Sequence, residues 1–204
     1  NGASGEGGPN GTYNEWQFFN GVATPTELSL QHIDELGGPE THNHYNTGWA
    51  WAFDTPFPYW KRWAGYEGGI ADMCIVSWPA KIPADSVPRQ QYVHAVDVVP
   101  TIYDLIGLEP PTEVAGYTQS PLEGESFAAA LTDPAAAAKS TQFYAMLGQR
   151  SVYEDGWLAC TLHPPLSGWG RFEEDEWELY HVAEDRAQAR NVAAEHPEKV
   201  QELV

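Results

Sequence analysis

The amino-acid sequence predicts an α/β fold that ends in a small antiparallel sheet with a flanking helix. Three stretches support this prediction. Residues 71–79, "ADMCIVSWP", form an apolar run that is typical of a largely buried strand. Residues 91–108 have the pattern of a short strand followed by a helix, and residues 141–163 contain β-rich stretches around a turn. A strand, a connecting loop and a helix in this order are typical of the last units of an α/β sheet.

The N-terminal part is predicted to consist of loops around one helix. Residues 1–20 are rich in glycine and show no sustained periodicity, which indicates a loop. Residues 23–38 have apolar side chains mostly three apart, with Thr26 as a possible N-cap and Gly37 just after the helix. Residues 39–60 form a second long loop, dense in His, Trp, Tyr and Pro. Loops of this length inside a compact domain are usually functional.

The central helix is predicted to be capped by Asp97, to tolerate Pro100 in its first turn and to end at Gly107. A linker-like stretch follows, and residues 125–133 offer one short helix.

The C-terminal sheet is predicted to hold three strands. Residues 141–163 are interpreted as two strands joined at Asp155 and Gly156, because an Asp-Gly pair suits a tight hairpin. Residues 177–182 provide the third strand, and the closing helix carries Pro197 in its first turn.

The charge of the chain limits the partners that it can bind. It holds 29 Asp and Glu against 10 Lys and Arg, a formal net charge of −19. Such a charge repels phosphate backbones and anionic lipid, so we expect neither nucleic acid nor a membrane surface as a partner.

The two cysteines, Cys74 and Cys160, are not spaced as metal ligands. Cys74 lies in the apolar run predicted to be a strand, so buried free thiols are favoured over the alternative of a disulfide.

Two of the ten cations, Lys61 and Arg62, stand side by side in the aromatic stretch "YWKRWAGYEGG". The sequence contains no G-x-S-x-G elbow, no phosphate-cradling Gly loop and no zinc-type spacing. Composition and periodicity alone therefore predict only an α/β chain, and the order of its local motifs carries the functional argument.

Three local motifs follow one another along the chain: "NGASGEGG" at residues 1–8, "TPFPYWKRWAGYEGGI" at residues 55–70, and "VDVVPTIYDLIG" at residues 96–107 followed later by "DGW" and "WELYHVAED". In this order and at these intervals, over nearly all of its length, the chain closely resembles the C-terminal part of a type I sulfatase, of the arylsulfatase family in the alkaline-phosphatase superfamily. The resemblance implies part of an alkaline-phosphatase-like catalytic domain over residues 1–115 and a small α+β subdomain over residues 116–204.

The resemblance implies an enzyme that hydrolyses sulfate monoesters with a formylglycine nucleophile beside a Ca²⁺ ion. Asn1 would be the calcium-binding Asn of an Asp-Asn-Gly motif, because Ca²⁺ prefers oxygen ligands. On the residues alone, a plain turn at Asn1 and Gly2 is favoured over a calcium ligand. The formylglycine motif, Cys-x-Pro-Ser-Arg, does not occur in this chain. We therefore expect a piece of a longer enzyme that is inactive alone.

The family also places a catalytic Lys shortly before a Gly pair, where its ammonium holds a sulfate oxygen. The usual spacing of six residues before Gly68 would select Arg62, whereas the preceding "TPFPYWK" favours Lys61 with one inserted residue. Without the resemblance, a snorkelling or cation–π surface role is the default for both cations. Gly68 and Gly69 are expected to have backbone roles, through positive φ or a close approach of the chain.

The long aromatic loop is expected to border the substrate entrance and to select the alcohol part of the ester, by stacking in particular. The candidate substrate-binding residues, with Arg62 among them, are His42, His44, Trp49 and Trp51. For each His, a plain surface role is the alternative.

Two other functions remain open at this stage. A phosphonate or phosphate monoester hydrolase of the same superfamily would share these motifs, and an aromatic-rich carbohydrate-binding module would use the Trp and Tyr residues as a stacking platform. The expected partners are a small sulfate ester and the remainder of the catalytic domain, or self-association of the truncated chain.

Overall fold

The computed structural model describes residues 2–163 and 169–204, which form two compact units. The first unit combines the described residues up to Asp72 with Phe143–Val204, and the second is Met73–Gln142. Both contain helices, and the strands pair in antiparallel sheets, so the predicted α/β class is confirmed. The predicted domain boundary after residue 115 concerns the intact parent protein and stays a prediction.

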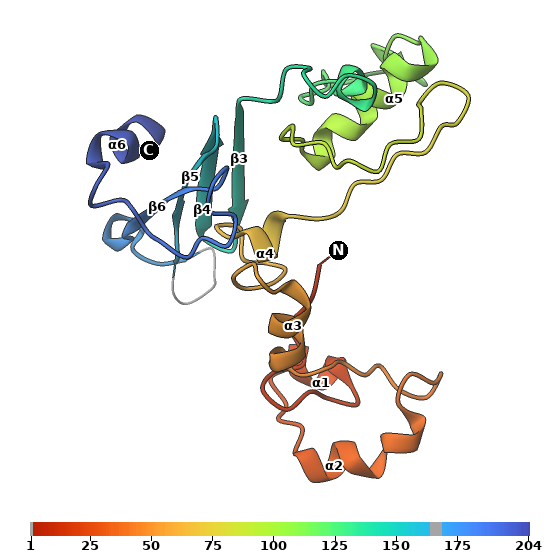
Figure 1. Ribbon diagram of the computed structural model, residues 1–204. Coiled ribbons are helices and arrows are strands. Elements are labelled where there is room, and N and C mark those ends of the chain that lie inside the picture. The colour runs from red at the N-terminus through yellow and green to blue at the C-terminus, as the bar shows by residue number, and fades with distance from the viewer. Residues whose placement is uncertain (1, 164–168) are drawn as a thin grey trace. The chain divides into compact units, whose positions relative to one another are not determined.

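Short helices dominate the N-terminal part of the first unit (Figure 1). The predicted helix is present but begins at Thr26, which is a helical residue and not the cap. Two further helices lie where loops were predicted, because Asn14 and Asn46 cap them by accepting hydrogen bonds from backbone N–H groups. The elements are α1 (Glu15–Phe19), α2 (Thr26–Gln31), the 3₁₀ helix η1 (Ile33–Glu35), α3 (Thr47–Asp54) and α4 (Glu67–Ile70). Among the described residues, no helix is both long and apolar enough to cross a membrane.

The C-terminal part of the first unit is a four-stranded sheet in the order β3-β4-β5-β6. Asp155 and Gly156 both have positive φ and join β4 to β5 in the predicted hairpin. Leu147 and Gly148 make a second positive-φ turn. This turn divides the first of the two strands predicted within residues 141–163 into two strands. The strands are β3 (Thr141–Met146), β4 (Gln149–Glu154), β5 (Trp157–Thr161) and β6 (Trp177–His181).

The core of the first unit lies around β5 and β6. Leu158, Cys160 and Leu179 are almost completely buried. The closing helix α6 (Pro197–Leu203) carries Pro197 in its first turn as predicted, and the Lys199 ammonium pairs with the carboxylate of Glu154 in β4 at 2.7 Å.

The stretch before α4 folds back so closely that side chains are excluded at two positions. An ideal Cβ on Gly68 would lie 2.4 Å from the carbonyl oxygen of Tyr59, and one on Gly69 would lie 2.1 Å from that of Trp63. Both distances are far below van der Waals contact, and the obstructing atoms belong to the backbone. Glycine is therefore required at both positions because the chain approaches closely. Neither Gly68 nor Gly69 has a positive φ.

Polar contacts fasten this folded stretch to the C-terminal sheet. The Tyr66 hydroxyl donates to the Glu178 carboxylate of β6 at 2.7 Å, and the Ser151 hydroxyl of β4 donates to the carbonyl of Ala64 at 2.6 Å. Burial, together with the Glu178 carboxylate, raises the pKa of the Tyr66 hydroxyl well above its usual range, so the hydroxyl stays a donor.

The segment after β6 adds a second set of contacts to the same stretch. The Gln188 amide accepts from the backbone N–H of Glu67 at 2.7 Å and donates to the carbonyl of Gly65 at 3.0 Å. The buried Glu67 carboxylate pairs with Arg186 at 3.1 Å. Burial raises the pKa of Glu67, and Arg186 opposes this rise.

The second unit is organised around the buried carboxylate of Asp97. This carboxylate accepts from the backbone N–H groups of His94 and Glu125 and pairs with Lys139 at 2.7 Å. Burial disfavours its charge, but these hydrogen bonds outweigh burial and lower the pKa of Asp97. Asp97 precedes the central helix as predicted, yet its side chain caps η2 and not that helix. The elements are η2 (Ala95–Asp97), α5 (Val98–Ile106), β1 (Glu113–Val114), β2 (Tyr117–Thr118) and η3 (Ala128–Leu131).

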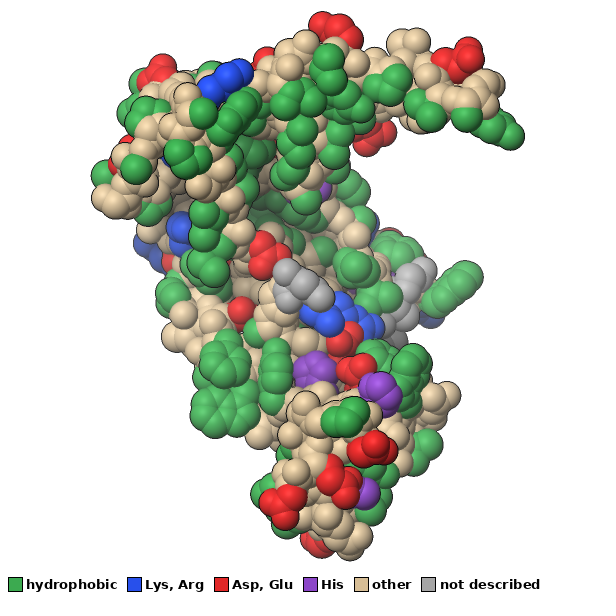
Figure 2. Space-filling model, turned by 90° about the vertical axis from the view of Figure 1, so that its right-hand side faces the viewer, with side chains coloured by type: hydrophobic (Ala, Val, Ile, Leu, Met, Phe, Trp, Pro, Cys, Tyr) green, Lys and Arg blue, Asp and Glu red, His purple; other side chains and the backbone are tan. Residues whose placement is uncertain are grey.

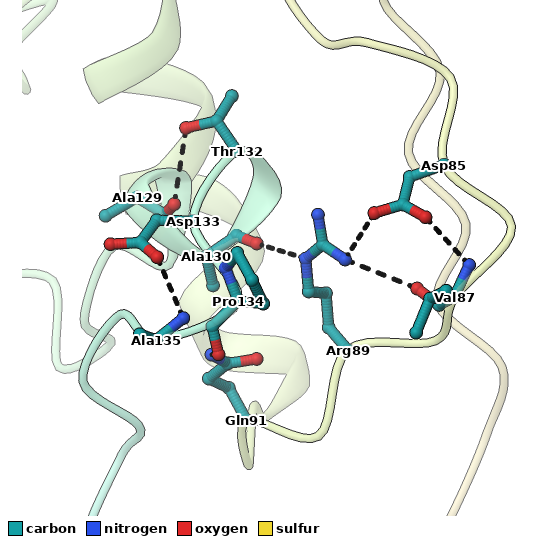
Figure 3. Close-up of polar contacts among 10 residues, drawn as sticks. All are labelled: Asp85, Val87, Arg89, Gln91, Ala129, Ala130, Thr132, Asp133, Pro134 and Ala135. Atoms are coloured by element: carbon teal, nitrogen blue, oxygen red, sulfur yellow. Dashed lines mark hydrogen bonds and ion pairs between the residues drawn. The ribbon is translucent and has the colours of Figure 1, made fainter.

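In the second unit, hydrogen bonds from side chains hold a segment without regular secondary structure (Figure 3). The Arg89 guanidinium donates to the carbonyl of Ala130 in η3 at 2.9 Å and to the Asp85 carboxylate at 2.7 Å. The Gln91 amide donates to the carbonyl of Pro134 at 2.8 Å. The predicted short strand that included His94 is absent, and the side-chain hydrogen bonds of Arg89 and Gln91 hold the segment before it.

The prediction of a buried strand over residues 71–79 is wrong for this chain. The segment is irregular, Met73 and Ile75 are 92% and 86% exposed, and Cys74 is exposed. A strand requires a neighbour for its backbone hydrogen bonds, and none of the strands in the described part of the chain pairs with this segment. Hydrophobic side chains accordingly cover much of the face shown in Figure 2.

A buried histidine after β5 has acceptors at both ring nitrogens. His163 Nδ1 lies 2.8 Å from the Asp175 carboxylate, Nε2 lies 3.1 Å from the carbonyl oxygen of Trp169, and the ring stacks on Phe172. Because both neighbours are acceptors, this arrangement fits a doubly protonated ring. The Asp175 hydrogen bond is the main reason that the pKa of His163 is raised.

We expect this histidine to make stability depend on pH. A raised pKa in the folded state stabilises the fold below the ordinary value of 6.5, and this contribution disappears as the pH rises through the raised pKa. The difference in the free energy of unfolding between wild type and His163→Gln should therefore be largest below pH 6.5 and shrink above it, as measured by denaturation at several pH values. His32→Gln, at an exposed ion pair, is the control. A difference independent of pH would contradict the assignment.

The Gly69→Ala substitution should destabilise the fold, because its Cβ would overlap the carbonyl of Trp63. The expected loss is about 1–3 kcal/mol in the free energy of unfolding, measured by urea denaturation. Gly2→Ala is the matched control, because its Cβ would meet only one atom, the Gly68 carbonyl oxygen at 3.8 Å. Equal losses in the two variants would show that close packing at Gly69 is not the cause.

Candidate active site

The N-terminal segment lies directly against the stretch that carries the cation pair. The backbone N–H of Lys61 donates to the carbonyl of Ala3 at 2.9 Å. An ideal Cβ on Gly5 would lie 2.4 Å from the indole nitrogen of Trp60, so glycine allows the two segments to touch. Residues far apart in sequence thus form one site.

A carboxylate that the sequence analysis did not single out lies at the centre of this site. One Glu6 oxygen pairs with the Lys61 ammonium at 2.8 Å and accepts from the Ser4 hydroxyl at 2.7 Å. The other oxygen pairs with the Arg62 guanidinium at 3.2 Å. Burial disfavours the charged form of Glu6, but the hydrogen bonds from Lys61 and Ser4 and the two positive charges lower its pKa. The carboxylate is therefore ionised at neutral pH.

Aromatic rings surround the backbone on both sides of the cation pair. Tyr59 stacks on Trp63 with ring centroids 4.2 Å apart and lies 4.5 Å from the ring of Tyr66. Trp60 has edge contacts with Trp51 and Trp63. Lys61 itself is 28% exposed, so its charge lies at a partly dehydrated surface. Electrostatic interactions are stronger in such a setting than in open water.

Backbone contacts hold the two candidate histidines, and their rings contact different aromatic residues. His44 exchanges two backbone hydrogen bonds with Thr12, and its ring contacts Tyr45. His42 forms a bridge with Asn14, and its exposed ring meets the edge of Trp16. Within the described residues, neither ring contacts Lys61, so the substrate role of the two histidines stays a prediction.

The two candidate tryptophans lie on α3 and are about half exposed. Trp49 stacks on Phe53, and Phe53 meets the ring of Tyr45. The Tyr45 hydroxyl in turn accepts from the backbone N–H of Ser4 at 2.8 Å. Trp51 is connected more directly to the site, through its edge contact with Trp60.

Sequence reasoning missed Glu6, Ser4 and Phe53. A signal for Glu6 was present, because it is the only acidic residue among the first fourteen. The role of Glu6 could not be predicted from this signal, because its two cationic partners, Lys61 and Arg62, are more than fifty positions away.

The predicted calcium ligand Asn1 lies outside the described residues. Within residues 2–163 and 169–204, no group of three or more His, Cys, Asp or Glu side chains is arranged to hold a metal ion. The calcium site therefore stays a prediction for the intact protein. Of the two thiols, Cys74 is exposed and Cys160 is buried, and burial raises the pKa of Cys160 well above its usual range.

Comparison with known proteins gives a consistent result. No family model matches the chain. An uncharacterized sulfatase of Schizosaccharomyces pombe is 26% identical over 183 residues, which is 88% of this chain and 32% of that protein. A sulfatase of Formosa agariphila is 26% identical over 140 residues, which is 65% of this chain and 24% of that protein. The chain thus spans about a third or less of the length of these relatives.

A solved structure has a similar fold. A Bacteroides thetaiotaomicron structure, labelled "6S-sulf" and described with the metabolism of multiple glycosaminoglycans, matches with a TM-score of 0.52 at 20% identity. The match covers 69% of this chain and 29% of that one. Sequence and fold together therefore confirm the resemblance that the motifs predict, and the chain is sulfatase-like.

Proposed function

We propose that the intact protein hydrolyses sulfate monoesters and that this chain supplies Lys61 as the cation that holds a sulfate oxygen. The observation that carries the proposal is the contact between Lys61 and the segment that begins with Asn1. The backbone bond from Lys61 to Ala3 and the ion pair with Glu6 bring together two motifs that are separated by more than fifty residues. The sulfatase-like relatives support the same reaction class.

Charge explains why a lysine suits this reaction. The ester carries a negative sulfate group, and negative charge develops on the leaving oxygen as the S–O bond breaks. An ammonium positioned at those oxygens stabilises the transition state, and its partly dehydrated aromatic surroundings strengthen the interaction. We propose that Arg62, beside it, contributes to attraction of the anion.

The remaining chemistry is proposed to come from other parts of the intact protein. Calcium, with Asn1 among its oxygen ligands, would supply a second positive charge at the sulfate group. The formylglycine nucleophile would come from a Cys-x-Pro-Ser-Arg motif that this chain does not contain.

The exposed apolar surface of the second unit supports a partner of this kind. Met73 and Ile75, in the segment that was predicted as a strand, are almost fully exposed. Ile102 and Ile106 of α5 are about half exposed. Because the relatives are about three times longer than this chain, we propose that the remainder of the catalytic domain covers these side chains. Self-association is the expected outcome for the chain alone.

The Lys61→Ala substitution in the intact parent, assayed with calcium, should lower kcat for an aryl sulfate by about 100-fold or more, as loss of one charge-stabilising donor does. Arg62→Ala should cost far less, because the Arg62 side chain is more exposed than that of Lys61 and its proposed role is only attraction of the anion. The reverse ranking would place the catalytic cation at Arg62. Faster hydrolysis of a phosphonate or phosphate ester would favour the related hydrolases, and turnover by the 204-residue chain alone would contradict the mechanism.

We further propose that the aromatic side chains of α3 contact the alcohol part of the ester, with His42 and His44 nearby in sequence. Trp49→Ala should raise KM for an aryl sulfate several-fold and change kcat little, because stacking is a binding interaction present before the chemical step. Trp16→Ala, an equally exposed tryptophan on α1, is the control. If Trp49→Ala abolished binding of a sugar that is not sulfated, a carbohydrate-binding role would be favoured instead.

A further inference from the structure

We propose that Glu6 is a positioning residue that holds the Lys61 ammonium in the direction required for sulfate, an inference that rests on the proposed function. Neither the family motifs nor the sequence pattern assigns this role to Glu6. It follows from the contacts that converge on its carboxylate.

The Glu6 carboxylate is itself held in place from three sides. The preceding Gly5 packs against the indole of Trp60, and the Ser4 hydroxyl binds the oxygen that faces Lys61. Ser4 is in turn fixed by the hydrogen bond from its backbone N–H to the Tyr45 hydroxyl. With a side chain that is only 14% exposed, Glu6 has little freedom to move.

A carboxylate held in this way restricts the lysine. A lysine ammonium sits on a flexible stem with four rotatable carbons and has three N–H donors. One N–H of Lys61 is directed to Glu6 at 2.8 Å, and the backbone N–H of Lys61 is fixed to Ala3. Anchoring at both ends of the side chain fixes the directions of the other two N–H bonds. Orientation before the reaction is a large part of what a catalytic group contributes.

The neighbouring arginine explains how a paired lysine still attracts an anion. A single Glu6–Lys61 pair would be neutral, and a neutral pair attracts sulfate weakly. Arg62 pairs with the second oxygen of the same carboxylate, so the group of two cations and one anion carries a net charge of +1. This arrangement gives the adjacent Lys and Arg separate roles, one in contact with substrate and one in balancing Glu6.

The test replaces Glu6 in the intact protein and separates kcat from KM. Glu6→Gln removes the negative charge with almost no change of shape. We expect kcat for an aryl sulfate to fall by about 10- to 100-fold, as for a misplaced catalytic group. KM should stay equal or decrease, because two unbalanced cations attract the anionic ester more strongly. Glu6→Asp, which keeps the charge on a shorter stem, should be intermediate, and the exposed Glu27→Gln should equal wild type.

A double-mutant cycle decides whether Glu6 acts through Lys61. In a Lys61→Ala background, Glu6→Gln should change kcat less than twofold, whereas in an Arg62→Ala background its effect should persist. Additive effects of Glu6→Gln and Lys61→Ala, or a Glu6→Gln variant with wild-type kcat, would overturn the proposal. A rise in KM with a lower melting temperature would indicate a purely structural role and would also overturn it.

A measurement without turnover keeps this inference distinct from the proposed function. In the intact protein, acylation of Lys61 by an amine-reactive acylating reagent, followed by mass spectrometry, should be slower than acylation of Lys81 and should accelerate several-fold in Glu6→Gln. An unchanged rate would overturn the pairing. If the rate changes but the wild-type parent hydrolyses no sulfate ester, the pairing stands and the proposed function fails.

Discussion

The geometry around Lys61 depends on one constraint, the close return of the chain between Tyr59 and Gly69. The carbonyl groups of Tyr59 and Trp63 occupy the space where side chains of residues 68 and 69 would lie. Only glycine fits at both positions, and the tight return fixes the backbone on the C-terminal side of Lys61. The bond to Ala3 fixes the lysine's own backbone, so its side chain starts from a defined point.

This returned stretch would have little independent stability, and the C-terminal sheet supplies what it lacks. Tyr66 is bonded to Glu178, Ala64 to Ser151 and Gly65 to Gln188, each through a buried or partly buried hydrogen bond. Buried polar groups are costly without partners, so these bonds permit essentially one arrangement of the stretch. The small C-terminal sheet is thus part of the scaffold of the candidate site, and Gln149 of β4 also donates a hydrogen bond to the backbone carbonyl of Arg62 at 3.2 Å.

Features determined by local chemistry were predictable from the sequence, and those that depend on distant partners were not. The turn at Asp155 and Gly156, the helix end at Gly107 and the helix start at Pro197 each follow from the backbone preference of one or two residues. The turn at Leu147 gave no such signal, because leucine rarely adopts positive φ. Residues 71–79 have the composition of a strand, but composition cannot provide the neighbouring strand that the segment requires. Glu6 was missed for the same reason, because its two cationic partners lie far along the chain.

The distribution of charge defines how an anionic ester could reach this site. With a formal charge of −19, the chain as a whole repels anions, so long-range steering works against such a substrate. At physiological salt, however, exposed charges act over only about 8 Å, so the repulsion is screened until the ester is close. At contact distance the local sign is reversed, because Lys61 and Arg62 outnumber Glu6. Under the proposed function, recognition of the ester would therefore be decided at short range, where the direction of the Lys61 ammonium would matter more than the total charge.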